Sequence, residues 1–181
     1  MVEMVASMLS GLLAAEMRVS ELVRTAERAI SVAETDALSG LNNRRGWDRL
    51  LASEEARCER YGHPATVLVA DLDGLKRVND TQGHGAGDEL IRTAARVLRE
   101  ELRESDVVAR IGGDEFAVLL VESGMERGDE VRQRIMAALA AAGVAASLGL
   151  GARNVAATLE EAWQEADAGM YVEKRARAAA R

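Results

Sequence analysis

The sequence predicts an α/β fold, in which a mixed central β-sheet is flanked by helices and preceded by a long N-terminal helix. The apolar, partly β-branched run 65–70 (ATVLVA) ends in Asp71-Leu72-Asp73-Gly74, which is typical of a strand buried on both faces. Two further apolar runs, 107–111 and 116–121, flank Gly112-Gly113. They predict a hairpin, because glycine adopts the positive φ that tight hairpin turns need. Segments of helical periodicity separate these strands, so helices should cover the sheet.

The first 34 residues predict a coiled coil. Apolar residues follow alternating three- and four-residue steps over four heptads, which favours a coiled coil over a helix packed on a globular core. The alternative is one amphipathic helix folded back on the domain. The off-stripe residues Met4, Met8, Leu13 and Met17 could widen the stripe, so the number of strands stays open. The stripe, interrupted only by Glu16, consists of Val2, Val5, Leu9, Leu12, Val19, Val23, Ala26, Ile30 and Ala33.

The remaining elements follow in an α/β order from residue 35 to residue 181, which we expect to form the second domain. Apolar residues at helical spacing and glycine or polar breaks mark them. The last helix begins at Thr158-Leu159-Glu160-Glu161, close to a capping box. In order, we expect a polar turn over 36–43, helices over 47–61 and 75–79, a glycine-rich turn through Gly87, a long helix from Asp88, the hairpin, a helix over 126–142, a strand over 143–150 and a helix over 159–177.

Composition indicates an ordinary globular protein. The chain has 181 residues, of which 48% are hydrophobic and 29% charged, enough for one domain and an appendage. The formal net charge of -7 argues against a nucleic-acid partner. The single cysteine excludes an intrachain disulfide. No apolar run approaches the roughly 20 residues of a membrane span, and no signal peptide is evident, so we expect a cytoplasmic location.

Acidic residues mark a candidate metal site. Asp114 and Glu115 adjoin the hairpin turn, and Asp71 ends the first strand. Ligands collect at the carboxyl ends of strands in open α/β sheets, and pairing this strand with the hairpin would bring the three acids together. Such a cluster of hard oxygen ligands suits Mg²⁺ carrying substrate phosphates. The competing interpretations are a plain acidic hairpin and an Asp-x-Asp that only caps the following turn.

Several motifs, in order, resemble those of a GGDEF domain, the catalytic domain of diguanylate cyclases. The resemblance runs from about Asp36 to the C-terminus, and its specificity comes from the number of independent matches. The motifs are DALSGLNNRR (36–45), DLDGLKRVND (71–80), Gly83-His84, Gly87-Asp88, GGDEF (112–116), Ser147-Leu148-Gly149, Ala166-Asp167 and Tyr171 to Lys174.

The resemblance implies a fold similar to the palm-like core of class III nucleotide cyclases and a defined reaction. Two GTP molecules, one held by each copy of a homodimer, are condensed into cyclic di-GMP with release of two pyrophosphates. The coiled coil would form the dimer. Each copy would hold two Mg²⁺ ions, with Mn²⁺ as an alternative, through Asp71, the Leu72 carbonyl, Asp114 and Glu115. The alternative function is a non-catalytic receptor that binds cyclic di-GMP or GTP.

The resemblance also assigns contacts to the substrate. Asp114, Glu115 and Lys76 would be catalytic. Asn79 and Asp88 would read guanine, whose N1–H and amino group suit a carboxylate acceptor; alternatively, Asp88 is only an acid favoured by the helix dipole. The other predicted contacts are the amides of Gly74 and Leu75, Gly112 and Gly113 beside the phosphates, Lys76 and Lys174 on the triphosphate, and His84, which contacts ligand or only orders its turn.

Two features lie outside the catalytic motifs. Arg103 and Asp106 match the family's inhibitory R-x-x-D site, which predicts product inhibition by bound cyclic di-GMP. The family tail usually reads Tyr-x-x-Lys-x-x-Gly-Arg-Asn, whereas here Lys174 is followed by Arg175-Ala176-Arg177-Ala178. The second basic contact of the tail is therefore either Arg177, shifted by one position, or absent.

Overall fold

The computed structural model describes residues 16–22, 24–25, 32–154 and 156–179, and the chain divides into two units, residues 1–34 and 35–181. In the first unit, the described residues 16–22, 24–25 and 32–34 are helical. Their large apolar side chains are exposed: Met17, Val19, Leu22 and Val32. Most of the predicted coiled-coil stripe, including Val2 to Leu12, lies outside the described residues.

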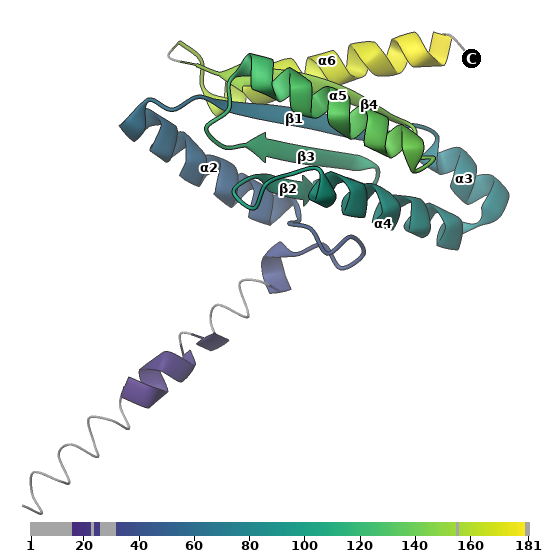
Figure 1. The fold of residues 1–181 in the computed structure, drawn as a ribbon. Coiled ribbons are helices and arrows are strands. Elements are labelled where there is room, and N and C mark those ends of the chain that lie inside the picture. Colours follow the sequence, from purple (N-terminus) through teal and green to yellow (C-terminus); the bar gives the residue numbers. More distant parts are fainter. Residues whose placement is uncertain (1–15, 23, 26–31, 155, 180–181) are drawn as a thin grey trace, which may run out of the picture. The chain divides into compact units, whose positions relative to one another are not determined.

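The second unit is built on a four-stranded sheet (Figure 1). Its strand order is β2 (Val107–Arg110), β3 (Glu115–Leu120), β1 (Ala65–Leu72) and β4 (Ala146–Arg153). Every neighbouring pair of these strands is antiparallel. Within the described residues, parallel pairing is limited to an isolated bridge between Asn42 and Ala109. The predicted helix-flanked sheet is confirmed, but the mixed character that we expected is confined to that bridge.

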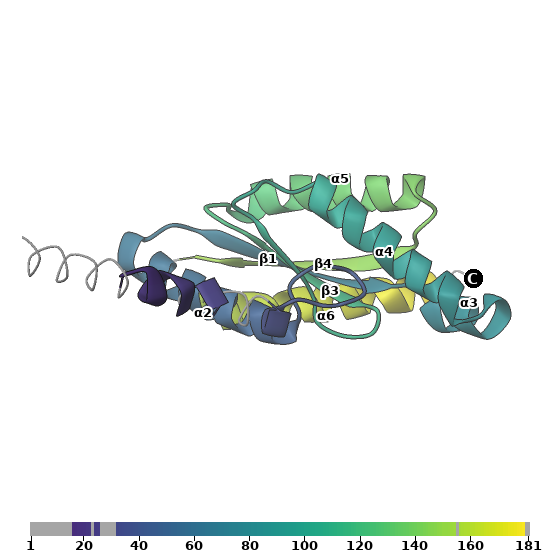
Figure 2. The ribbon, with the colours of Figure 1, turned by 90° about the horizontal axis from the view of Figure 1, so that it is seen from below.

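Helices cover both faces of the sheet, as Figure 2 shows. Helices α4 (His84–Glu100) and α5 (Met125–Ala141) lie on one face, and α2 (Arg44–Tyr61) and α6 (Leu159–Ala179) lie on the other. All eight residues of β1 are buried, as the apolar run predicts. Successive side chains of β1 alternate between two core clusters: Leu68 packs with residues of α4 and α5, and Val67 with residues of α2 and α6. Among the described residues, no helix is long and apolar enough to cross a membrane.

Several element boundaries differ from the prediction. The glycine-rich turn expected through Gly87 is wrong: α3 (Leu75–Gln82) runs further than expected, and α4 already begins at His84. Only Gly83, with φ of 86°, separates the two helices. Helix α2 begins three residues early because the Asn43 side chain accepts a hydrogen bond from the Gly46 amide. At the start of α6 the predicted capping box forms, with reciprocal bonds between Thr158 and Glu161.

Two glycines bring α6 into backbone contact with β4. A Cβ on Gly149 would overlap the carbonyl oxygen of Ala166, and one on Gly151 would overlap that of Ala162. The helix therefore lies directly on the strand. This close packing carries the C-terminal half of α6, with Lys174, to the end of the sheet where β1 terminates.

Candidate active site

Asp71 is a buried carboxylate at the carboxyl end of β1. Its side chain is 6% exposed, and the ammonium of Lys174 lies 2.7 Å from its Oδ1. The approach is an ion pair without the alignment of a hydrogen bond. Burial raises the pKa of Asp71, and the negative charges of Asp114 and Asp73 add to this rise, which Lys174 only partly offsets. A nearby positive charge would therefore stabilise the ionised form of Asp71.

The β2–β3 hairpin supplies the second acid of the site. The amide of Leu72 donates to the Asp114 carbonyl at 2.9 Å, and Asp71 is the direct cross-strand partner of Glu115. The charge of Asp114 acts on Asp71. Glu115 instead folds over Gly112, where a Cβ would lie 2.5 Å from its Oε2. The predicted hairpin is confirmed, but its explanation is wrong: neither Gly112 nor Gly113 has a positive φ, and Gly112 makes room for the Glu115 side chain.

Asp73 and Glu173 extend the site, and sequence reasoning gave neither a role. Ser147 Oγ donates to Asp73 Oδ1 at 3.0 Å, and Arg177 Nη1 lies 3.7 Å from Asp73 Oδ2. Glu173 accepts the Leu148 amide at 2.9 Å and both Nε and Nη2 of Arg177 at 3.1 and 2.8 Å. The i,i+4 spacing of Glu173 and Arg177 was the available signal. Arg177 thus lies beside the acids, as one of the two tail alternatives requires.

The donor set is suited to a hard divalent cation. Two buried oxygens, Asp71 Oδ1 and Asp73 Oδ2, face only the cations of Lys174 and Arg177, at 2.7 and 3.7 Å, in the described part of the chain. Carboxylate oxygens are the ligands that Mg²⁺ prefers. No three His, Cys, Asp or Glu side chains in the described ranges converge into a complete metal site. The protein residues therefore fit a partial coordination sphere, of the kind that substrate phosphates and water complete.

Helices α3 and α4 carry the two predicted guanine-reading residues, Asn79 and Asp88. A Cβ on Gly87 would overlap Asn79 Oδ1, so the Asn79 side chain packs against the residue that precedes Asp88. Asp88 forms a loose ion pair with Arg92 at 3.9 Å. His84 is exposed at the start of α4.

The predicted phosphate contacts lie at the start of α3, directly after β1. Gly74 takes φ of 82° at the N-cap, and no side chain caps the helix. The amides of the first turn, which point toward the N-terminus in any α-helix, therefore have no capping side chain, and such an end is a favourable place for phosphate. Lys76 is exposed there, whereas Leu75 buries its side chain and could contribute only its backbone.

The predicted inhibitory residues adjoin a cavity of about 310 Å³, which Arg99 also lines. Both carboxylate oxygens of Asp106 accept backbone amides, from Arg103 at 3.0 Å and from Val121 at 3.2 Å. Arg103 is exposed. Asp106 therefore shapes its own loop, and the Arg103 side chain is the more accessible of the two.

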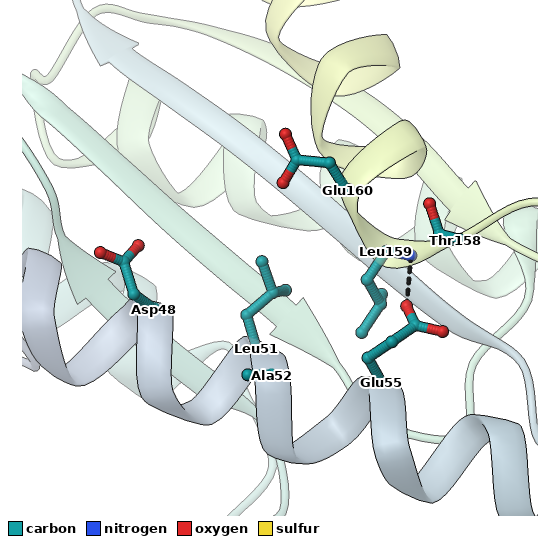
Figure 3. A pocket seen from close by; sticks show the side chains of 7 residues that line it. All are labelled: Asp48, Leu51, Ala52, Glu55, Thr158, Leu159 and Glu160. Atoms are coloured by element: carbon teal, nitrogen blue, oxygen red, sulfur yellow. Dashed lines mark hydrogen bonds between the residues drawn. The ribbon is translucent and has the colours of Figure 1, made fainter.

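A separate hollow of about 420 Å³ lies between α2 and α6. In Figure 3, Asp48, Leu51, Ala52 and Glu55 project from α2, facing Thr158, Leu159 and Glu160 at the start of α6. Glu55 already accepts the Leu159 amide at 2.6 Å and Arg153 Nε at 3.0 Å, so it fastens the two helices together. Arg153, which contacts Glu55 beside the hollow, lies six residues along β4 from Ser147, which contacts Asp73 in the acidic site. Six residues of a strand span roughly 20 Å, so the hollow is separate from the acidic site.

Known proteins share both the sequence and the fold. Residues 33–179 match the model of the family described as "Diguanylate cyclase, GGDEF domain". The chain is 38% identical over 153 residues to diguanylate cyclase DgcP of Pseudomonas aeruginosa, a match that covers 80% of this chain and 23% of DgcP. It thus spans about a quarter of that relative.

Two solved structures are similar over nearly the whole chain. One is diguanylate cyclase SiaD of Pseudomonas aeruginosa, in complex with its activator SiaC, with a TM-score of 0.78 at 30% identity over 93% of this chain and 68% of SiaD. The other is the coiled coil and GGDEF domain of DgcB from Caulobacter crescentus, in complex with c-di-GMP, with a TM-score of 0.80 at 26% identity over 94% and 95%. Because the family match extends from residue 33 to residue 179 and includes the acidic site, the chain belongs to the GGDEF family of diguanylate cyclase domains.

Proposed function

We propose that this chain is a catalytically active diguanylate cyclase domain, which condenses two GTP molecules into cyclic di-GMP and releases two pyrophosphates. The observation that carries the proposal is the buried carboxylate of Asp71, next to Asp114 of the hairpin and paired with Lys174. Family membership supports the reaction class. One copy of the site, which holds one GTP, is called a half-site below.

In each half-site, Asp71, Asp114 and the Leu72 carbonyl would hold Mg²⁺, and Glu115 would turn from Gly112 to complete a second position. Bound Mg²⁺ would neutralise the triphosphate, polarise the α-phosphorus and lower the pKa of the attacking 3′-hydroxyl. The low exposure of Asp71 keeps water from competing for its carboxylate.

Cationic and amide groups would orient the triphosphate. Lys76 and the amides of Gly74 and Leu75 would receive the outer phosphates at the start of α3. Lys174 and Arg177 would approach from α6, where Glu173 holds the Arg177 guanidinium through two hydrogen bonds. Gly112 and Gly113 would leave the hairpin backbone close to the phosphate.

Asn79 and Asp88 would select guanine. The Asp88 carboxylate can accept both the N1–H and the amino group of guanine, whereas adenine presents an acceptor at N1 and would be repelled. The packing of the Asn79 side chain against Gly87, the residue before Asp88, supports this pairing. Exposed His84 would lie near the same turn.

The reaction requires two half-sites that face each other, and the N-terminal helix is the proposed dimer element. Exposed Met17, Val19 and Leu22 on its described helical part support this role. The similar DgcB structure includes a coiled coil together with its GGDEF domain. Sedimentation with and without residues 1–34 tests the proposal: the full chain should be dimeric and the shortened chain monomeric at the same concentration. The same oligomeric state for both chains would contradict it.

Product inhibition would act through Arg103, with Asp106 shaping its loop. The cavity that Arg103 lines with Arg99 is also lined by Glu104 and Asp106, so it offers guanidinium donors for phosphate and carboxylate acceptors for guanine. The substitution Arg103→Ala should raise the amount of accumulated product, because added cyclic di-GMP would no longer inhibit. Unchanged inhibition in this variant would show that the site has no such function.

Product identification tests the main proposal. The full chain is incubated with GTP and Mg²⁺, and the nucleotides are separated and identified by mass spectrometry. We expect cyclic di-GMP and pyrophosphate from the wild type and neither from Asp114→Asn. A dimeric wild-type protein that binds GTP without converting it would contradict the enzyme proposal and would favour a receptor.

A further inference from the structure

The ion pair between Lys174 and Asp71 joins a buried group to an accessible one. The Asp71 side chain is 6% exposed and that of Lys174 is 40% exposed. The ammonium therefore reaches the carboxylate from the solvent side, on a flexible four-carbon stem. It can withdraw without disturbing the core.

Lys174 is the cation paired with Asp71. It is the only cation that forms an ion pair with Asp71 within the described ranges, whereas Arg177 pairs with Glu173 at 2.8 Å and with Asp73 at 3.7 Å. The Lys174 ammonium lies 2.7 Å from Asp71 Oδ1, at the place where a divalent cation would have to bind.

We propose that Lys174 makes Asp71 selective for the complex of a divalent metal with a nucleoside triphosphate, and against the free metal ion. This inference rests on the proposed function. A free divalent cation at Asp71 would meet the ammonium at close range in a poorly solvated site, where like charges repel strongly. When the metal binds together with a triphosphate, this repulsion is relieved, because the phosphate oxygens can accept hydrogen bonds from the Lys174 ammonium.

The exchange of partners requires only a side-chain movement. Glu173, the residue before Lys174, accepts a hydrogen bond from the Leu148 amide and so attaches this part of α6 to β4. One to two turns earlier, α6 is in close backbone contact with Gly149 of β4. The Lys174 backbone is therefore fixed, and its ammonium alone moves from carboxylate to phosphate.

Two binding measurements with opposite expected signs test this role. Free Mn²⁺ binding is followed at pH 8 by the electron paramagnetic resonance signal of the unbound ion. Binding of a non-hydrolysable GTP analogue with Mn²⁺ is measured by calorimetry. In Lys174→Met, free Mn²⁺ should bind at least about fivefold more tightly, the lower end of ordinary coupling between two binding events. The nucleotide complex should bind roughly tenfold more weakly, because a charged contact is lost.

Two further variants separate charge at Asp71 from charge elsewhere. Arg175→Met removes the same charge from the next residue, which lies over the Tyr171 ring at 6.0 Å, and should leave both affinities near those of the wild type. Lys174→Arg keeps the positive charge, so it should bind free Mn²⁺ as weakly as the wild type does, unlike Lys174→Met. Melting temperatures of all variants confirm that each is folded.

The results separate this inference from the proposed function. If free Mn²⁺ binds Lys174→Met no more tightly than it binds Arg175→Met, the selectivity role is overturned while the enzyme proposal stands. If the wild type does not bind the Mn²⁺ complex of the GTP analogue, the proposed function fails and this inference fails with it.

Discussion

Arg110 ties the hairpin turn to the beginning of the globular unit. Its Nε and Nη2 donate to the Gly113 carbonyl at 3.2 and 2.8 Å, and its Nη1 donates to Asp36 Oδ1 at 3.2 Å. Asp36 also accepts the Ser39 amide at 2.8 Å and the Ser39 hydroxyl at 2.6 Å. The sequence motifs include Asp36 but gave Arg110 no role, because nothing local to residue 110 indicates a partner 74 positions away.

The pKa of Asp36 makes this connection testable by pH. Burial would raise the pKa, but the hydrogen bonds from Ser39 and Arg110 outweigh it and hold the pKa below its ordinary value. A carboxyl group whose pKa is lower in the folded state stabilises the fold above its ordinary pKa of about 4. That contribution is lost as the pH falls through the lower, folded value.

We therefore expect Asp36→Asn to lower the free energy of unfolding by on the order of 1–3 kcal/mol at neutral pH, the range for hydrogen bonds to charged groups. The difference from the wild type should shrink as the pH falls below about 4. Urea unfolding between pH 3 and 7 measures it. Asp48→Asn, on the exposed pair with Arg44, is the control and should stay within about 1 kcal/mol of the wild type. A difference that does not depend on pH would contradict the assignment.

Gly87 controls the position of a predicted base-reading side chain. The substitution Gly87→Ala should preserve the fold, because alanine is favoured in helices and the overlap falls mainly on the movable Asn79 amide. Displacing that amide should weaken GTP binding and narrow the preference for GTP over ATP. Calorimetry with both nucleotides measures these effects. Gly85→Ala, in the same helix with nothing within 4 Å, should bind as the wild type does. Unaltered selectivity in Gly87→Ala would exclude Asn79 from base reading.

At the scale of elements, the contact between α6 and β4 sets the geometry of the site. A methyl group at Gly149 would meet the helix backbone, which cannot turn away as a side chain can. We expect Gly149→Ala to lower the free energy of unfolding by about 1–3 kcal/mol, the usual cost of overpacking. Metal–nucleotide affinity should fall as well, because Lys174 moves with the helix. Thermal unfolding and calorimetry provide the two readouts.

The matched control comes from the opposite side of this contact. A Cβ on Gly169 of α6 would lie 3.5 Å from the Gly149 Cα, an ordinary separation. Gly169→Ala should therefore retain or slightly increase stability, since alanine suits a helix interior. Similar losses in both variants would mean that the glycine of β4 has no special role.

The elements that could be predicted from the sequence are those with strong local signals. The apolar run before Asp71 correctly predicts a buried strand, and the Thr158–Glu161 box correctly marks the start of α6. The glycines misled the prediction twice. Gly87 lies inside α4, where it admits the Asn79 side chain, and Gly112 admits the Glu115 side chain rather than adopting a positive φ. Both roles depend on close tertiary approach, which local patterns do not encode.

At the scale of the whole molecule, the site combines residues from distant parts of the chain. The motifs pointed to Asp71, Asp114 and Glu115, because each belongs to a local pattern near β1 or the hairpin, but they gave Asp73 and Glu173 no role. The pairing of Asp71 with Lys174 and the bond of Glu173 to the Leu148 amide could not be predicted, because they depend on where α6 packs against the sheet. The antiparallel pairing of β4 with β1 could not be predicted either, because no local sequence pattern indicates which strands flank β1 or in which direction they run.

A mixing experiment tests the central proposal, that the acidic cluster is one half of a two-part site, most directly. Wild-type and Asp114→Asn chains are combined at constant total concentration, allowed to exchange subunits, and supplied with GTP and Mg²⁺. If cyclic di-GMP requires two intact half-sites, its rate of formation should follow the square of the wild-type fraction. A rate proportional to that fraction would show that one intact half-site suffices, and would contradict the proposed arrangement.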